Sequence, residues 1–285
     1  MKSNNMNIFK TMILMLMLVS VSGLGAEELL LEQFAIEFNT AFQSQDIAKV
    51  KQLVRDNPNI TNVFRRYSFE LERLSKEGRD AYNIADYPTA LKKWEQGLEL
   101  AYQAKSQLAI SEFLNNIGLV YDTFGQYQKS SSYYQQAFEI DLKIGDKNGE
   151  RSALTNLGVI YRKLGQYQKS LDYYQQALEI DRELKNKQGE GDDLNNIGIV
   201  YKELGKYQRA LRYYQQALKI HHEIKNRRGK VAYFNNVGVL YRKLGQYQTA
   251  LTYYETALEI YRELKNKQGE GNTLANIGSV YSGLN

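Results

Sequence analysis

Residues 153–190 read ALTNLGVIYRKLGQYQKSLDYYQQALEIDRELKNKQGE, and near-copies of this stretch lie on both sides of it. The copies keep a fixed step, because a glycine returns every 40 residues and a tyrosine follows it three residues later. The glycines are Gly118, Gly158, Gly198, Gly238 and Gly278, and the tyrosines are Tyr121, Tyr161, Tyr201, Tyr241 and Tyr281. A fixed period of this length predicts an array of stacked repeats, in which each copy packs on its neighbours.

Each copy has the pattern of two helices joined by a short turn. Apolar and small residues recur at helical spacing from Leu154 to Leu164 and again from Tyr167 to Leu178, with Gly165-Gln166 between the two runs. A glycine inside a helix costs roughly 0.5 to 1 kcal/mol relative to alanine, so its return in every copy indicates close helix packing. We assign the 23 tyrosines to packing within and between repeats rather than to a surface that stacks on bases.

The order L-x-x-L-G-x-x-Y-x-x-x-G-x-Y-x-x-[AS]-x-x-x-Y-x-x-A-L-x-I resembles the tetratricopeptide repeat. It departs from that family's signature at the ends, because Leu154 replaces the tryptophan and Arg182 stands in the place of the proline. The 40-residue step and the D/N-K-x-G connector are most similar to the repeats of Pins-type and kinesin-light-chain proteins. The resemblance implies an all-α fold, a right-handed α-solenoid of stacked antiparallel helix pairs. Without the proline, we expect the second helix to run about one turn further and to stop at the turn of residues 186–189.

Residues 1–26 have the pattern of an export signal. Lys2 and Lys10 lie in a start without acidic residues, an apolar run follows from Thr11 to Val21, and small residues lead to Ala26. The apolar run is short for a membrane span. We therefore predict a signal peptide and a periplasmic or extracellular protein, with an uncleaved N-terminal anchor as the alternative.

The rest of the chain divides into a cap and the array. Residues 27–70 have a helical pattern without the motif and are predicted to form an N-terminal helical cap, since end repeats are commonly atypical. The array is predicted over residues 71–285. Its repeats are 71–110, 111–150, 151–190, 191–230 and 231–270, followed by the half-repeat 271–285.

The search for catalytic chemistry is mostly negative. The chain has no cysteine, which excludes thiolate nucleophiles, disulfides and cysteine-bound metals. His221 and His222 are its only histidines, and as consecutive helical residues they point about 100° apart, so we expect them at the surface without a metal or catalytic role. The formal charge of +5 falls by two when Lys2 and Lys10 leave with the export signal, and acidic residues are interspersed with basic ones. We therefore predict a protein that is not an enzyme and that needs no cofactor, metal or nucleic acid.

The resemblance also implies a binding groove. In the family, the first helices of successive hairpins line the concave face, and an asparagine at the sixth position bonds the backbone of a bound extended peptide. Positions are counted from the first residue of each repeat, so that Asn156 is the sixth residue of repeat 151–190. The predicted groove residues are the asparagines at positions five and six and the cations at positions twelve and thirteen. They are Asn116, Asn156, Asn196, Asn236, Asn276, Asn195, Asn235, Arg162, Lys163, Lys202, Arg242 and Lys243. Two alternatives stay open: the asparagines can cap or brace neighbouring helices, and the cations can form a solvated face.

Two classes of function follow from this sequence. The first is a non-catalytic scaffold that binds an extended peptide or a partner protein in the groove. The second is the sensor or regulatory part of a larger enzyme system, because the chain resembles the N-terminal array of bacterial proteins that join such repeats to a CHAT peptidase domain. The apolar residues of the half-repeat also predict a docking or self-association surface, formed by Leu274, Ile277, Val280 and Tyr281.

Overall fold

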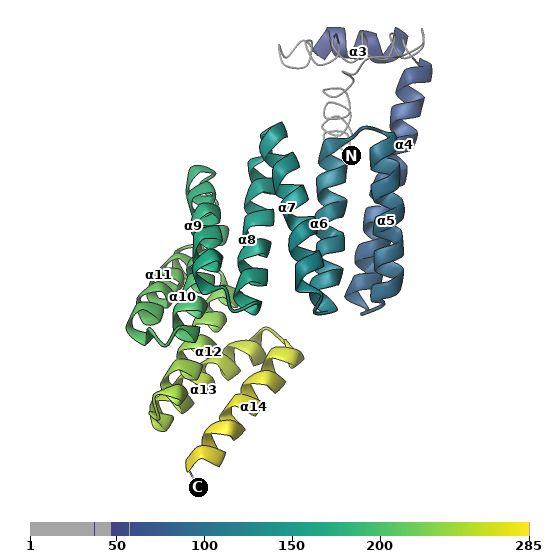
Figure 1. The fold of residues 1–285 in the computed structure, drawn as a ribbon. Coiled ribbons are helices and arrows are strands. Elements are labelled where there is room, and N and C mark those ends of the chain that lie inside the picture. The colour runs from purple at the N-terminus through teal and green to yellow at the C-terminus, as the bar shows by residue number, and fades with distance from the viewer. Residues whose placement is uncertain (1–36, 38–46, 57, 285) are drawn as a thin grey trace. The chain divides into compact units, whose positions relative to one another are not determined.

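The computed structural model describes residue 37, residues 47–56 and residues 58–284 (Figure 1). Within these ranges the regular structure is entirely α-helical, as predicted. The predicted export signal and part of the predicted cap, residues 27–36, 38–46 and 57, lie outside the described residues. None of the described helices combines the length and the apolar character that crossing a bilayer requires.

The chain divides into two compact units, residues 1–153 and residues 154–285, and the boundary falls inside helix α8 (Lys147–Lys163). In the first unit α4 packs on α5, α5 on α6 and α6 on α7. These helices span Pro58–Asn83 (α4), Tyr87–Gln103 (α5), Gln107–Thr123 (α6) and Tyr127–Ile144 (α7), and α3 (Ile47–Asp56) precedes them. Their buried side chains form one core that includes Trp94, Phe113 and Ile117.

The second unit continues the same alternation of helices. Here α9 packs on α10, α10 on α11, α11 on α12, α12 on α13 and α13 on α14 (Figure 1). The helices span Tyr167–Glu183 (α9), Lys187–Glu203 (α10), Tyr207–Glu223 (α11), Arg227–Lys243 (α12), Tyr247–Glu263 (α13) and Lys267–Leu284 (α14). We call α4, α6, α8, α10, α12 and α14 the first helices and α5, α7, α9, α11 and α13 the second helices.

The turns explain the 40-residue step, since two 17-residue helices and two three-residue turns fill it in the copy that begins at α8. The second helix α9 passes Arg182 but ends at Glu183, three residues before the turn predicted at residues 186–189, so that prediction was wrong. Asn186 is instead the N-cap of α10, and its side chain accepts a hydrogen bond from the backbone N–H of Gly189 at 3.3 Å. The reversal is made by Lys185, whose φ of 55° lies in the left-handed region.

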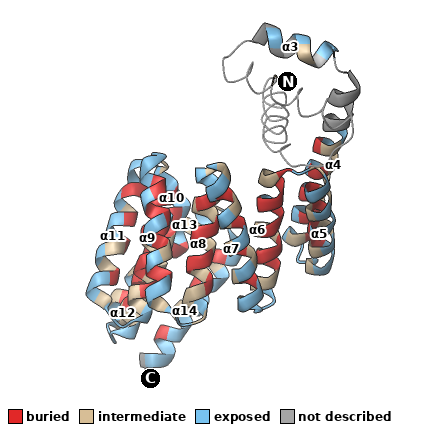
Figure 2. Cartoon of the chain, turned by 45° about the horizontal axis from the view of Figure 1, so that its top comes forward, coloured by how far each residue is buried: buried red, intermediate tan, exposed pale blue. Residues whose placement is uncertain are grey.

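The recurring glycine of the first helix makes room for a tyrosine of the second. A Cβ added to Gly158 would lie 2.6 Å from the ring of Tyr174, which is fully buried. The same contact joins Gly118 to Tyr134, Gly198 to Tyr214 and Gly238 to Tyr254. Figure 2 shows buried residues on the sides of the helices that face one another. The prediction that the glycines permit close helix packing is confirmed.

A second row of contacts lies near the end of α7, α9, α11 and α13. It consists of the buried Asp141, Asp181 and His221 and the half-buried Tyr261, and a Cβ on the glycine eight residues further along would collide with each of these side chains. His221 is 1% exposed, so the prediction of two surface histidines was wrong for this one, whereas His222 is exposed. The ring of His221 fits because both Gly191 and Gly229 lack a side chain where they contact it.

Candidate binding groove

Polar side chains join neighbouring first helices along one surface of the second unit. Thr155 of α8 donates to Asp193 of α10 at 3.2 Å. Further along the same pair, Arg162 pairs with Glu203 at 3.0 Å. These bonds place the third, fifth, twelfth and thirteenth positions of successive copies on one shared face, which we call the groove face.

The asparagines at the sixth position are all half-buried on their first helices. Asn236 of α12 donates to the side-chain oxygen of Asn195 of α10 at 2.8 Å. Within the described residues, Asn156, Asn196 and Asn276 make no side-chain hydrogen bond, and the buried amide nitrogen of Asn116 also lacks a partner there. The amides of Asn156 and Asn196 are therefore free to bond another molecule.

The fifth-position asparagines are more strongly engaged. Asn235 donates to the hydroxyl of Tyr261 at 3.3 Å and accepts from Thr273 at 3.2 Å, so its amide bridges α12, α13 and α14. Asn195 accepts the bond from Asn236, and Asn115 donates to the carbonyl of Ser111 in its own helix at 3.2 Å. Asn195 and Asn235 therefore hold helices together, and all three amides have less capacity left for a ligand.

Cations gather where the first helices of the second unit end. Arg162, Lys202 and Arg242 are half-buried, while Lys163 and Lys243 are exposed. Burial lowers the pKa of Lys202, and the like charges of Lys243 and Arg162 lower it further, against the opposing effect of Glu203. A half-buried ammonium group among like charges is a site that an anionic group would stabilise.

The tyrosine hydroxyls lie beneath these charges. Tyr174, Tyr214 and Tyr254 are fully buried, and over the described ranges their hydroxyls have no hydrogen-bond partner. Burial raises the pKa of Tyr174 to about 12, and Arg162 lies near enough to oppose the shift without a hydrogen bond of regular geometry. Burial also raises the pKa of Tyr254, which Arg242 opposes. The groove face is therefore backed by polar groups that are held in place by the packed rings.

The first unit has a different set of groups on its first helices. The positions that hold Arg162 and Lys163 in α8 hold Asp122 and Thr123 in α6, and the Thr123 hydroxyl lies 2.8 Å from that of Tyr82. Glu112 accepts a hydrogen bond from Ser75 at 2.6 Å and pairs with Arg79 at 3.6 Å. Half-buried cations at the twelfth position of the first helices are thus found in the second unit.

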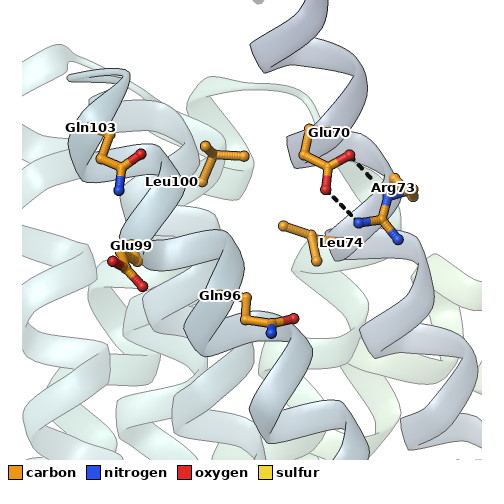
Figure 3. Close-up of a pocket in the computed structure, with 7 residues that line it drawn as sticks. All are labelled: Glu70, Arg73, Leu74, Gln96, Glu99, Leu100 and Gln103. Carbon is orange, nitrogen blue, oxygen red and sulfur yellow. Dashed lines mark hydrogen bonds and ion pairs between the residues drawn. The ribbon is translucent and has the colours of Figure 1, made fainter.

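A cavity of about 340 Å³ lies between α4 and α5 in the first unit (Figure 3). Glu70 and Arg73 pair with each other at its edge, and Arg73 also pairs with Glu77. The opposite wall is formed by Gln96, Glu99, Leu100 and Gln103 of α5. Because it holds no nucleophile beside a general base, this cavity does not suggest catalysis. Over residues 47–56 and 58–284, no three His, Cys, Asp or Glu side chains are arranged to hold a metal ion.

The sequence matches the tetratricopeptide repeat family over residues 150–221 and 231–285, and a second model of the same family over residues 111–144. Together these matches cover more than half of the chain. A comparison with curated proteins finds no match.

Several solved structures have the same fold at low identity. BtubC (BKLC) from P. vanneervenii is 19% identical over 82% of this chain and 92% of its own, with a TM-score of 0.60. A Rap protein complexed with Competence and Sporulation Factor is 18% identical over 92% of this chain and 76% of its own, with a TM-score of 0.66. A kinesin light chain-like protein from Podosopora anserina is 16% identical over 69% of this chain and 97% of its own, with a TM-score of 0.57.

Proposed function

Because the chain belongs to the tetratricopeptide repeat family, we propose that it is a non-catalytic scaffold that binds an extended segment of a partner protein along the groove face of its second unit. The family is generally non-catalytic, and its fold suggests a protein–protein interaction scaffold. One similar structure holds a Rap protein complexed with Competence and Sporulation Factor, which supports a role of this fold in holding a partner.

The observation that carries the proposal is the pairing of free amides with half-buried cations on the same helices. Asn156 and Arg162 lie on α8, and Asn196 and Lys202 lie on α10. An amide side chain offers one acceptor and two donors, so Asn156 and Asn196 suit the backbone of an extended segment. The cations suit an acidic side chain of the same segment. We therefore propose a ligand that is extended and carries at least one Asp or Glu.

The other predicted groove residues contribute unequally to this proposal. Asn195, Asn235 and Asn236 are bonded to other side chains, so we assign them to holding the helices in register. Lys163 and Lys243 are exposed, so we assign them to long-range attraction of an acidic segment rather than to a fixed contact.

The electrostatic part is tested with peptides that the immobilised chain selects from a displayed library of short unstructured peptides. We expect enrichment of acidic sequences. Lys202→Gln should weaken binding of a selected peptide by about ten-fold, because a charge-assisted hydrogen bond is lost. Lys202→Arg should retain most of the affinity, and replacing the peptide's acidic residue by its amide should remove the difference between the parent and Lys202→Gln. Selected peptides without acidic residues, or equal affinity of Lys202→Gln, would contradict this part of the proposal.

A further inference from the structure

Helix α14 repeats the sequence of the other first helices, but one of its faces is open. In the four preceding copies, a Cβ added to the recurring glycine would lie 2.5 to 2.8 Å from the tyrosine of the following second helix. At Gly278 of α14 such a Cβ would meet nothing within 4 Å. The space that a tyrosine ring fills in each of these four copies is therefore open here.

The neighbouring side chains show the same difference. Leu274 is 45% exposed, whereas Leu194 at the matching place in α10 is 2% exposed. Tyr281 is 53% exposed, whereas its counterpart Tyr201 stacks on Tyr213 of the second helix, with ring centroids 5.3 Å apart. Two of the four residues predicted for docking face inward, because Val280 is fully buried and Ile277 packs beside it against α13. The open face is therefore formed by Gly271, Leu274, Gly278 and Tyr281.

We propose that this open face of α14 binds an amphipathic helix of a partner protein, and that the partner helix carries an aromatic ring opposite Gly278. The argument is continuity with the interface that the chain forms in each of the four preceding copies. There the covering helix has two adjacent tyrosines, one on the glycine and one stacked on the first-helix tyrosine, and a fully or nearly buried alanine three residues further on. The stacked pairs are Tyr121–Tyr133, Tyr161–Tyr173, Tyr201–Tyr213 and Tyr241–Tyr253.

Gly271 adds a second requirement for the partner. Its counterpart Gly191 gives room to His221 of the following second helix, since a Cβ there would lie 2.7 Å from the imidazole ring. His221 comes seven residues after Tyr214, which packs on Gly198. Nothing lies within 4 Å of a Cβ at Gly271. The partner helix should therefore carry a bulky side chain two turns after its aromatic ring, on the same face.

The test uses a synthetic peptide with the sequence of α11, Tyr207–Glu223, because this helix contains the whole required pattern. Labelled peptide is titrated with the full chain and followed by fluorescence anisotropy. We expect saturable binding, and we expect the peptide variant Tyr214→Ala to bind at least ten-fold more weakly, since it lacks the ring that fills the space at Gly278.

The decisive protein variant is Gly278→Ala. The added methyl group meets no atom of the chain, and alanine favours a helix more than glycine does, so the melting temperature should stay equal or rise. Binding of the α11 peptide should nevertheless fall at least ten-fold, because the methyl group occupies the space of the ring. Ser279→Ala, on an exposed neighbour of Gly278, is the matched control and should leave binding unchanged.

Two results would overturn the proposal. The first is the absence of peptide binding, or equal binding to Gly278→Ala and to the parent chain. The second is a parent chain that is dimeric and does not bind the peptide, together with a Gly278→Ala variant that is monomeric. The occupant of the face would then be a second copy of the chain. Binding in the groove is measured with different peptides, so either result leaves the proposed function untouched.

Discussion

At the scale of single residues, Asp141 and Asp181 show how one neighbour decides the state of a buried carboxyl group. Both are fully buried at the same place in successive copies. Asp181 accepts a hydrogen bond from the side-chain N–H of Asn186 at 2.6 Å, but the residue at the matching place after Asp141 is Asp146, which has no such donor. The nearby hydroxyl of Ser111 points to the carbonyl of Ala137 instead, at 3.5 Å, so both oxygens of Asp141 lack a partner among the described residues.

This difference predicts a pH dependence of stability. The pKa of Asp141 is raised from 3.8 to about 7, mainly by burial and in smaller part by the charges of Asp146 and Glu150, against the opposing effect of the nearby Ser111 hydroxyl. Because the folded state holds this proton more tightly than the unfolded chain, its contribution to stability is complete below about pH 4 and is lost as the pH rises to about 7. The loss amounts to at most about 4 kcal/mol.

We expect Asp146→Asn to recover part of that loss, because an asparagine can donate to Asp141 as Asn186 does to Asp181 and remains a good N-cap. Urea unfolding of the parent and the variant at pH 5 and at pH 8 measures it. The variant should gain stability mainly at pH 8, and Asp141→Asn should remove the dependence. An equal change at both pH values would contradict the account.

At the scale of helices and turns, the two kinds of turn differ in the residue that takes the left-handed conformation. The turn inside a copy uses a glycine, such as Gly165 with φ of 72°, except in the first copy, where Ala85 has a φ of 63°. The turn between copies uses a lysine, namely Lys105, Lys185, Lys225 or Lys265, except at Gly145. A side chain in this region costs roughly 1 to 2 kcal/mol, so the turns between copies carry strain that the turns inside them avoid.

We therefore expect Lys225→Gly to stabilise the fold by about 0.5 to 1 kcal/mol. The substitution relieves the backbone strain of the folded state, and the greater conformational entropy of glycine in the unfolded chain offsets part of this gain. The exposed side chain of Lys225 makes this a change of backbone preference alone. Gly165→Ala is the matched opposite and should destabilise the fold. Urea midpoints of both variants measure it, and a lower midpoint for Lys225→Gly would disprove the explanation.

The helices could be predicted from the sequence because the period, the glycines and the tyrosines all describe contacts that repeat in every copy. The end of α9 was misplaced because glycine commonly follows a helix, whereas Gly189 lies in the first turn of α10 and packs on Asp181. A signal for the burial of His221 was present, since Gly191 is a glycine where the two preceding copies have Ser111 and Arg151. The bond of Asn236 to Asn195 depends on how two helices from different copies lie against each other, which the pattern of one copy does not specify.

At the scale of the whole molecule, one repeat pattern supports two units with different surface chemistry. The packing residues are shared, but half-buried cations at the twelfth position of the first helices occur in the second unit, and the matching residue of α6 is Asp122. We therefore propose that residues 154–285 bind the acidic extended segment. Export stays a prediction, because residues 1–26 lie outside the described ranges.

The measurement that tests the groove most directly is the affinity of the double variant Asn156→Ala and Asn196→Ala for a peptide selected by the parent chain. Both amides are unengaged, and alanine favours a helix more than asparagine does, so the variant should melt at the same temperature as the parent or higher. Two lost amide contacts should weaken binding by about five- to one-hundred-fold. The control, Gln208→Ala with Gln215→Ala on exposed parts of α11, should change neither quantity. A double variant that binds the peptide as tightly as the parent, or that melts at a clearly lower temperature, would show that these asparagines brace the helices and do not bind a ligand.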